Sequence, residues 1–550
     1  MESSADKPRE KNLSPHDSLT SSPLSSADIE ANGVDIEDID DYVADPIDRY
    51  ATRASLAQRA RSLTRYGGVP PMGGNRAWPA KILNEDEYKV EFDGPDDPLC
   101  PFNWSNTKKF TNGFIMTYPS LALVWGSAIY GSALEFIEVE FHVGQAVSAL
   151  GISLYILGFA CGPVFWGPLS EVYGRRLPLV CSLVGLTCFS WWAATADKFY
   201  QLMVYRFCCG SIGGASMSII PAAMGDILPV RSRGVGISMY SLCVVAGPAI
   251  SPMVGGFLAH SSMGWRSTLY SSAIMASVAL VLVVCFLSET YHPVILKQKA
   301  RTIRSATGNQ FVFSAHERVE LDLKVVLDKV ITVPFQMLLT EPILMLTATY
   351  QGFLYGVLYL CLDAIPIIFT SYGWKGGVVT LPYISLFLGA VVANVTNLTI
   401  FDPKFKRDLA KSGKQVYPEA RLPMMMVGSC VFPTSIFLLC WSGAYKVHWF
   451  VPTLGLFFLG YGLITLFQPI INYTVDTFRL RAASAMAANV FVRSGLGAAF
   501  PIFGKAMFNN LGTQWAGTLL GCLALLLSPF SFIFYRWGPK LRAMSKSTQQ

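Results

Sequence analysis

Charged residues are scarce in this sequence. Asp, Glu, Lys and Arg make up 15% of its 550 residues, whereas ordinary soluble domains carry about 25%. Hydrophobic residues reach 52%, and the mean hydropathy is +0.40. This balance excludes a soluble enzyme of this length, a disordered scaffold and a secreted disulfide mini-domain. It is typical of a protein that crosses a membrane many times, because lipid-facing helices carry charge only at a high cost.

The sequence also lacks motifs for nucleotide or metal chemistry. It has no Gly-x4-Gly-Lys-Ser/Thr loop, so it does not cradle ATP phosphates by that route. The six histidines are dispersed, and the 12 cysteines show no CxxC or zinc spacing. We therefore expect no enzyme, no metal site and no cofactor. Transport driven by an ion gradient remains, with the proton gradient as the energy source.

The N-terminus lacks the apolar stretch of a signal peptide. Residues 1–108 carry 12 basic and 20 acidic side chains, whereas residues 109–550 carry 31 and 17. We interpret residues 1–108 as a cytosolic tail that is mostly disordered, because its composition cannot bury a core. The basic excess of the remaining chain indicates cytosolic loops beside membrane spans rather than nucleic-acid binding.

Twelve apolar runs follow the tail, each long enough to span about 30 Å of hydrocarbon as a helix. The longest polar interruption, at 288–342, divides them into six and six. The sequence predicts an all-α membrane protein with two six-helix bundles, at 109–288 and 343–537, a cytosolic linker at 289–342 and a cytosolic tail at 538–550. The runs lie near 110–134, 147–169, 177–196, 200–223, 234–258, 268–287, 343–368, 378–400, 423–444, 449–472, 484–507 and 515–536.

Basic residues gather in the even-numbered loops between these runs and in the C-terminal tail. The odd-numbered loops hold only four of them: Lys198, Arg266, Lys375 and Lys446. Because cytosolic loops carry the excess of Lys and Arg in membrane proteins, we expect both termini and the linker on the cytosolic side.

The two halves of the membrane body repeat weakly, as expected for a transporter built from two related bundles. Asp226 ends the fourth run and Asp476 the tenth, and two arginines follow each of them closely. Aligning Gly210 with Gly460 places an apolar residue opposite Arg206. The equivalent position in the second bundle therefore tolerates a residue without charge.

Three ionisable residues inside the runs are candidates for proton coupling: Arg206, Asp363 and Arg493. A charge at membrane depth is costly unless it faces a cavity or a partner. Asp363 or Glu135 would supply an acidic partner for the arginines. For Arg206 we favour coupling or substrate contact over structural pairing, whereas for Arg493 both interpretations stay open. Glu135 is better explained as an anchor at the membrane interface.

Small residues and prolines gather in the fifth run. Two prolines four residues apart free backbone carbonyls and bend a helix, and small side chains let a neighbouring helix approach closely. We expect a hinge or a seal here. The residues are Gly247, Pro248, Ser251, Pro252, Gly255 and Gly256.

The second run ends in a glycine-spaced turn with a carboxylate and two arginines. We expect a gate latch, in which Glu171 faces the positive N-terminus of the eleventh span and Arg175 pairs with Asp226. The alternative is a simple positive anchor, which would explain the arginines but not the glycine spacing. The residues are Gly167, Glu171, Gly174, Arg175, Arg176 and Asp226.

Polar and aromatic residues in the seventh and tenth runs are candidates for substrate binding at the midplane. Most aromatics in such helices only pack or lie at interfaces. The candidates are Tyr350, Gln351, Phe353, Gln468 and Asn472.

These motifs match a known family. Residues 167–176 resemble motif A of the major facilitator superfamily, with Glu171 where many members have Asp. Residues 206–215 are similar to motif B, and this resemblance implies that Arg206 takes part in proton coupling. Residues 247–256 look like the antiporter motif C, with Ser-Pro in place of a second Gly-Pro pair.

The resemblance covers residues 97–542 and points to the fungal twelve-span drug:H⁺ antiporters, with features ordered as in polyamine- and cycloheximide-resistance-type exporters. It implies a proton-coupled antiporter that exports drugs, toxins or amphipathic and cationic metabolites by alternating access. A dedicated transporter of polyamines, secondary metabolites or organic acids with the same fold is the alternative. An importer, and a receptor that has lost transport, have less support.

The expected partners follow from this interpretation. They are a small-molecule substrate, protons and membrane lipid, with no nucleic acid, and we expect a monomer. The family that the chain resembles favours a fungal plasma membrane over the vacuole. We expect a multi-pass membrane protein whose two termini are cytosolic.

Overall fold

The computed structural model of the chain describes residues 88–94, 97–307, 311–318, 323–411, 418–478 and 481–543. Most of the predicted tail thus lies outside the described residues. The chain forms two compact units, Met1–Lys89 with Thr302–Val312, and Val90–Arg301 with Phe313–Gln550. In the smaller unit, Arg304 donates a hydrogen bond to the carbonyl of Val312 at 2.8 Å. The long apolar helices belong to the larger unit.

The first half of the larger unit is a set of long helices with short connections. Apolar side chains dominate them, and prolines are tolerated inside α5, α7, α10 and α11 because neighbouring helices supply partners for freed backbone groups. The elements are α5 (Asn106–Ile129), η3 (Tyr130–Ala133), α6 (Leu134–Phe141), α7 (Gln145–Tyr173), α8 (Arg176–Ala194), α9 (Phe199–Gly213), α10 (Ala215–Ile227), α11 (Val230–Ala259) and α12 (Arg266–Phe286).

The segment before α5 and the predicted linker contain regular structure as well. The buried ammonium of Lys299 donates to Asp97 Oδ2 at 3.2 Å and to the carbonyl of Glu91, which fastens the segment before η2 to α13. The elements are η2 (Pro101–Asn103), α13 (His292–Thr307), η4 (Ala315–Arg318) and α14 (Leu323–Thr340).

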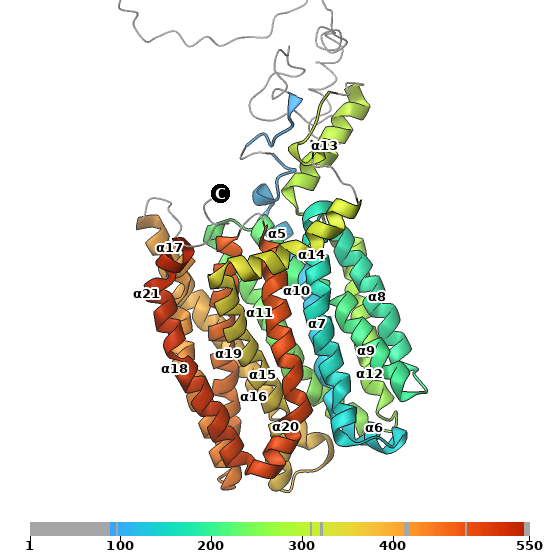
Figure 1. Cartoon of the computed structure of the whole chain (residues 1–550), viewed down its shortest axis with the longest axis vertical. Coiled ribbons are helices and arrows are strands. Elements are labelled where there is room, and N and C mark those ends of the chain that lie inside the picture. Colours follow the sequence, from blue (N-terminus) through green and yellow to red (C-terminus); the bar gives the residue numbers. More distant parts are fainter. Residues whose placement is uncertain are drawn as a thin grey trace, which may run out of the picture. The chain divides into compact units, whose positions relative to one another are not determined.

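The second half repeats the pattern of long helices. Its elements are α15 (Pro342–Ser371), η5 (Gly376–Thr380), α16 (Tyr383–Thr396), η6 (Asn397–Phe401), α17 (Asp402–Lys411), η7 (Pro418–Arg421), α18 (Pro423–Ala444), α19 (Phe450–Thr477), α20 (Ala482–Leu527) and α21 (Pro529–Ala543). In Figure 1 these elements are coloured from yellow to red.

Within the described residues, 11 helical segments are long and apolar enough to cross a membrane. The last of them, Ala482–Gly538, joins two helices across Gly512, whose φ of 77° is left-handed. Glycine adopts this conformation without strain. Counting the two parts separately gives the twelve spans that the sequence predicts, in an all-helical fold.

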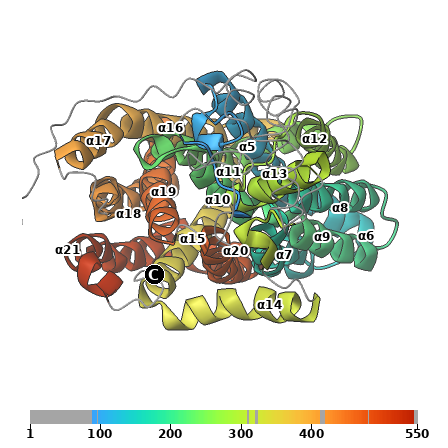
Figure 2. The same ribbon diagram turned by 90° about the horizontal axis from the view of Figure 1, so that it is seen from above.

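The two halves of the larger unit pack against each other along two seams. One seam joins α7 to α20 and the other joins α11 to α16, while α14 contacts both α7 and α20. Figure 2 shows the two groups of helices side by side, with α14 along one edge. We call the end of the bundle where α7 finishes at Tyr173 the linker end, and the end where it begins at Gln145 the α6 end.

Two glycines that the sequence repeat aligns make the same contact in the two halves. A Cβ on Gly210 of α9 would lie 2.1 Å from the carbonyl oxygen of Tyr155 on α7. A Cβ on Gly460 of α19 would lie 2.0 Å from the carbonyl oxygen of Leu386 on α16. Both positions hold glycine because the helix backbones touch there, which is the close approach that small residues permit in membranes.

Gly460→Ala is expected to destabilise the protein by about 1–3 kcal/mol, because a methyl group against a backbone carbonyl forces α16 and α19 apart. The check is thermal unfolding of the purified protein in detergent. Gly495→Ala is the matched control, since a Cβ at this glycine meets nothing within 4 Å. Equal unfolding temperatures for the two variants would contradict this account of the packing.

Candidate functional site

A cavity of about 730 Å³ lies between the two halves, in the part of the bundle nearer the α6 end. Its wall comes from α5, η3, α6, α7 and α11 of the first half and from α15, η5, α16 and α20 of the second. Apolar side chains, three aromatic residues and a few polar groups share the lining, as in small-molecule sites. The aromatic residues are Tyr359, Trp374 and Tyr383, and the ionisable ones are Glu135, His260, Asp363, Lys375 and Lys505.

Asp363 is the one predicted coupling residue that faces this cavity. Its Oδ2 lies so close to α20 that a Cβ on Gly504 would approach it to 2.8 Å. The ammonium of Lys505, the next residue of α20, is the charge that acts on the carboxylate. Both residues also line a smaller cavity of about 190 Å³ between α7 and α20. The carboxylate of Asp363 and the ammonium of Lys505 therefore line the same two cavities.

Tyr359 of the cavity wall takes part in a polar contact across the two halves. Its hydroxyl, on α15, shares a hydrogen bond of 2.9 Å with Ser127 Oγ on α5. The hydroxyl of Tyr355, one helical turn nearer the linker end, lies 3.4 Å from that of Tyr359 and does not line the cavity. This contact therefore lies on the side of the cavity toward the linker end.

The motif of small residues on α11 brings that helix close to its neighbours. Cβ atoms on Gly247 and Gly255 would lie 2.9 Å from Val124 and 2.8 Å from Ile129, both on α5. One on Gly256 would lie 2.5 Å from the hydroxyl of Thr380 in the other half. Two polar contacts hold these helices together. Ser132 Oγ donates to the carbonyl of Pro252 and Thr380 Oγ1 donates to that of Met253, at 3.0 and 3.3 Å.

The other members of this motif lie in the same part of α11. Pro248 and Ser251 are buried, and Pro252 and Gly256 line the cavity. The motif therefore forms both the wall of the cavity and the tight seam beside it.

Arg206 is buried in the first half and has no carboxylate partner there, contrary to the acidic partner we expected. Its guanidinium donates to three backbone carbonyls and lies over two tyrosine rings. The carbonyls belong to Gly151, Gly126 and Ser127, at 2.6, 3.2 and 3.3 Å. The rings belong to Tyr130 and Tyr155, at 4.1 and 4.6 Å. Two of the carbonyls are available because α5 tightens into η3 just beyond them, which disrupts the regular helical hydrogen bonds.

Arg493 points from α20 toward the first half of the chain. It is fully buried, and its Nη2 lies 3.9 Å from the sulfur of Met217 on α10. The rings of Tyr355 and Phe467 lie beside its guanidinium, at 4.9 and 5.7 Å. Neither arginine contacts Asp363 or Glu135 within the described residues, so the three predicted coupling residues do not form one cluster.

The predicted substrate residues lie outside the main cavity. Tyr350 stacks on Phe530, with ring centroids 5.2 Å apart, while Phe353 is partly buried against the core. Gln351 donates to the carbonyl of Phe467, and Gln468 donates to Ser238 Oγ on α11. Gln468 and Asn472 line a pocket of only about 20 Å³. In this conformation they are packed at the closed side of the bundle.

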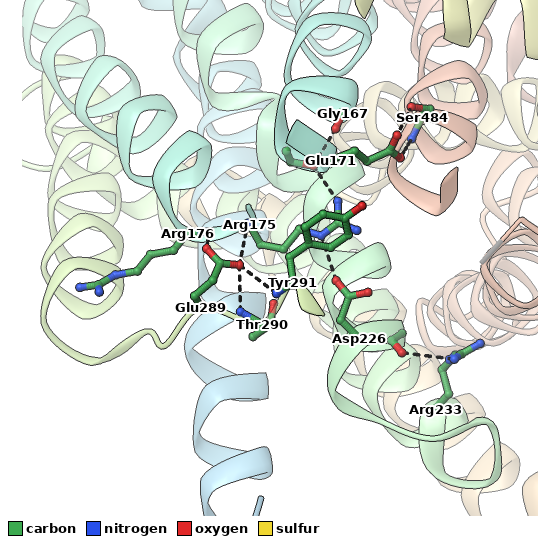
Figure 3. A network of polar contacts seen from close by, with 12 residues as sticks. Gly167, Glu171, Arg175, Arg176, Asp226, Arg233, Glu289, Thr290, Tyr291 and Ser484 are labelled. Atoms are coloured by element: carbon green, nitrogen blue, oxygen red, sulfur yellow. Dashed lines mark hydrogen bonds and ion pairs between the residues drawn. The ribbon is translucent and has the colours of Figure 1, made fainter. Parts of the chain in front are cut away.

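At the linker end, Glu171 joins the two halves. Its carboxylate accepts hydrogen bonds from the backbone N–H and the hydroxyl of Ser484, at 3.0 and 2.9 Å (Figure 3). Ser484 lies in the first turn of α20, where unpaired N–H groups and the helix dipole favour an anion. Gly167, one turn earlier on α7, lets the helices touch, since a Cβ there would lie 2.9 Å from the carbonyl of Ala483.

Arg175 pairs with Asp226 at the end of α10, with Nε and Oδ2 2.9 Å apart (Figure 3). It also donates to Ser170 Oγ, and its guanidinium lies over the ring of Tyr291. Burial acts to lower the pKa of this guanidinium, but the charges of Asp226 and Glu171 and the hydrogen bond to Asp226 raise the pKa above its ordinary value. Arg175 therefore stays charged, and its pair holds the turn against α10.

Glu289, which follows α12, was not anticipated from the sequence. Its carboxylate accepts the backbone N–H groups of Arg175 and Arg176, at 2.9 and 3.0 Å, as well as those of the two residues that follow it. Gly174 has a φ of 90°, and a Cβ there would lie 2.6 Å from Glu289 Oε2. Glycine and carboxylate thus fix the turn of the latch together, and the side chain of Arg176 caps the carbonyl of Val284.

Glu289→Gln is expected to loosen this turn, because an amide nitrogen cannot accept the N–H groups that the carboxylate binds. Hydrogen bonds to charged groups contribute about 1.5–3 kcal/mol, so amide exchange at residues 174–178 should quicken roughly ten- to hundredfold. Hydrogen–deuterium exchange measured by mass spectrometry checks this. Unchanged exchange relative to Glu140→Gln, an exposed carboxylate at the α6 end, would refute the assigned role.

A second network crosses the two halves beside the first. The carboxylate of Asp476 on α19 binds Nη1 of Arg233 on α11 at 2.5 Å and Nε of Arg421 at 2.6 Å. Arg421 also donates to the carbonyl of Val230 at 2.9 Å. All three charged side chains are at most 7% exposed. We call these three residues the linker-end clamp, because they tie α11 to α19 and η7.

The geometry is thus a cavity at the α6 end and closed polar networks at the linker end, in a twelve-span helical protein. The sequence profile of the Major Facilitator Superfamily matches residues 120–501. The chain belongs to this superfamily.

Two relatives of this superfamily member cover most of its length. The "Major facilitator superfamily multidrug transporter FLU1" of Candida albicans is 39% identical over 560 residues, which is 97% of this chain and 92% of the relative. The "Multidrug transporter TPO1_2" of Candida glabrata is 43% identical over 484 residues, which is 88% of this chain and 83% of the relative.

Solved superfamily structures share the fold at low sequence identity. The proton:xylose symporter XylE bound to 6-bromo-6-deoxy-D-glucose superposes with a TM-score of 0.56 at 15% identity, over 80% of this chain and 100% of the symporter. The human organic anion transporter MFSD10 reaches a TM-score of 0.53 at 14% identity. This family and fold belong to transporters, and no group of three metal-binding side chains is present among the residues that the structure describes.

Proposed function

We propose that this protein is a proton-coupled antiporter that exports drugs, toxins or amphipathic and cationic metabolites by alternating access. The observation that carries the proposal is a carboxylate, Asp363, on the wall of a 730 Å³ cavity whose opposite end is closed by cross-half polar networks. The names of the FLU1 and TPO1_2 relatives support drugs as cargo.

The basic loops favour a cytosolic linker end, and in this orientation the cavity at the α6 end faces the outside. In it, cationic cargo beside Asp363 meets outer solvent. A proton that neutralises the carboxylate removes the attraction and releases the cargo, and the protonated form then returns to the inward state. Arg206 and Arg493 take part in the coupling, Arg206 from within the first half and Arg493 from α20 beside Met217 of the first half. The latch at Glu171 and Arg175, with Asp226, controls the linker end, and the motif on α11 closes the α6 end when the linker end opens.

Several finer features complete the proposal. Two six-helix bundles at 109–288 and 343–537 rock against each other around the linker at 289–342. The protein acts as a monomer in a fungal plasma membrane, with both termini in the cytosol and with lipid, protons and the cargo as partners. Tyr350, Gln351, Phe353, Gln468 and Asn472 contact cargo once the linker end opens.

A dedicated transporter of one metabolite is the second candidate. Lys375 and Lys505 in the cavity wall favour an organic acid as its cargo, whereas Glu135 and Asp363 favour a polyamine. A panel of polyamines and organic acids in the assay below separates these cases.

The test uses purified protein in liposomes that are acidic inside. Uptake of a fluorescent cationic amphiphile should depend on the pH gradient and stop when a protonophore is added. Uptake that persists with protonophore, or that is equal in protein-free liposomes, contradicts proton-coupled antiport of such cargo.

A further inference from the structure

One face of α15 follows the pathway between the two halves. Gln351, Tyr355, Tyr359 and Asp363 are spaced four residues apart, so each lies about 6 Å further along the helix than the one before. Asp363 and Tyr359 line the cavity, Tyr359 is bonded to Ser127, and Tyr355 lies one turn nearer the linker end against Arg493. The carboxylate of Asp363 and the guanidinium of Arg493 beside Tyr355 thus lie about 12 Å apart along the axis of α15.

The positive group of this path, Arg493, lacks a carboxylate partner. Among the described residues, its Nε and Nη1 are buried without a hydrogen bond, and its Nη2 lies 3.9 Å from the sulfur of Met217. The guanidinium also donates a hydrogen bond to the hydroxyl of Tyr240 on α11, a neutral group that donates its own proton to the carbonyl of Met217. A buried guanidinium that is left without a compensating partner is strongly unfavourable.

Three other deeply buried arginines among the described residues have a carboxylate or backbone carbonyls as partners. Arg175 binds Asp226, Arg233 binds Asp476 although its Nε is unbonded, and Arg206 binds three backbone carbonyls. Arg493 has neither kind of partner among the described residues, which indicates that an anionic partner arrives from outside the protein.

Further polar atoms around this level of the bundle also lack partners. They are the side-chain oxygens of Gln351 and Gln468 and both polar atoms of Asn489, which lies one turn before Arg493 on α20. The rings of Tyr355 and Phe467 flank the guanidinium. An anionic head with an aromatic or aliphatic body fits such surroundings, because the rings accept the body and the guanidinium accepts the head.

We propose that Arg493 is the binding site for the carboxylate of an amphipathic organic acid or zwitterion. The inference rests on the proposed transport function and extends its cargo beyond cations. In the described conformation the Tyr359–Ser127 hydrogen bond separates Arg493 from the cavity. The carboxylate reaches the guanidinium when the linker end opens.

The test is equilibrium dialysis of the full chain in detergent with two probes of nearly equal shape, naphthalene-1-acetate and naphthalene-1-acetamide. We expect the wild-type protein to bind the acetate roughly ten- to hundredfold more tightly, as for a hydrogen bond to a charged group. Arg493→Gln should remove this preference. Arg493→Lys should keep part of it, because lysine retains the charge without the two-pronged geometry. Arg481→Gln, an exposed arginine at the start of α20, should retain all of it.

Three results would overturn the proposal. The first is equal binding of the two probes by the wild-type protein. The second is a preference for the acetate that survives in both Arg493 variants. The third is a wild-type preference that chloride abolishes, which would assign the site to an inorganic anion. Should Arg493→Gln fail to fold, Arg493→Lys decides between the outcomes. The liposome assay with the cationic amphiphile is independent of these probes. Cation transport without acetate preference defeats this inference alone, whereas acetate preference without gradient-driven uptake defeats the transport proposal.

Discussion

Asp476→Asn is expected to open the linker end and to destabilise the protein by about 3–5 kcal/mol, the usual effect of breaking a buried ion pair. The carboxylate is 1% exposed and lies between the guanidinium groups of Arg233 and Arg421. With an amide in its place, two buried cations face each other without an anion. The closed state loses its strongest cross-half contact, so the conformational equilibrium should shift toward a state that is open at the linker end.

Thermal unfolding and labelling of a cysteine placed at Gly225 measure the two effects. Gly225 lines a cavity of about 340 Å³ beside the clamp, so a thiol there should react faster when the linker end opens. Glu140→Gln is the matched control. Its ion pair with Arg266 is more than 30% exposed on both sides, and such pairs contribute only about 0–1 kcal/mol. Similar unfolding of both variants would show that the clamp does not stabilise the closed end.

Asp363→Asn is expected to abolish gradient-driven accumulation of cationic cargo down to the level of protein-free liposomes. The amide preserves the shape of the cavity wall but can neither carry a proton nor attract a cation. Exchange of labelled for unlabelled neutral cargo should persist, because the helices can still alternate without a proton. The measurement is uptake with a pH gradient beside counterflow without one, in the same preparation.

The control for this variant is Glu138→Gln. Glu138 binds Ser148 Oγ at 2.8 Å and does not line the cavity, so full gradient-driven uptake is expected. Gradient-driven uptake that also survives in Asp363→Asn would remove Asp363 from the coupling role and return the search to the other ionisable residues of the cavity.

Local pattern predicted much of the fold and of the latch. Hydrophobic runs of helical length define the spans, because lipid leaves few other ways to satisfy a backbone. The alignment of Gly210 with Gly460 predicted equivalent positions, and in both the helix backbones touch. Arg175, Asp226 and Glu171 each lie close in sequence to the end of a helix, where the backbone geometry is nearly fixed. The pairing of Arg175 with Asp226 and the approach of Glu171 to the eleventh span could therefore be predicted.

Other contacts could not be predicted from the sequence. Asp476 meets Arg233 across 243 residues, and no periodicity indicates which arginine crosses the seam. Glu289 follows an apolar helix as an ordinary polar residue, yet it caps a turn that begins more than 100 residues earlier. Arg206 binds backbone carbonyls instead of the expected acidic partner. The change from α5 to η3 makes these carbonyls available, and such a detail of backbone geometry could not be predicted from the sequence.

We expect the two ends of the pathway to open alternately. Paired spin labels measure this directly in a chain whose 12 native cysteines are replaced. One pair, at Lys198 and Val447, spans the two halves at the α6 end, and the other, at Arg231 and Lys404, spans them at the linker end. Distances are recorded with and without cationic cargo at high and low pH. We expect each shortening of the first pair to accompany a lengthening of the second. Two distances that change together, or a second distance that stays constant while the first shortens, would contradict the account.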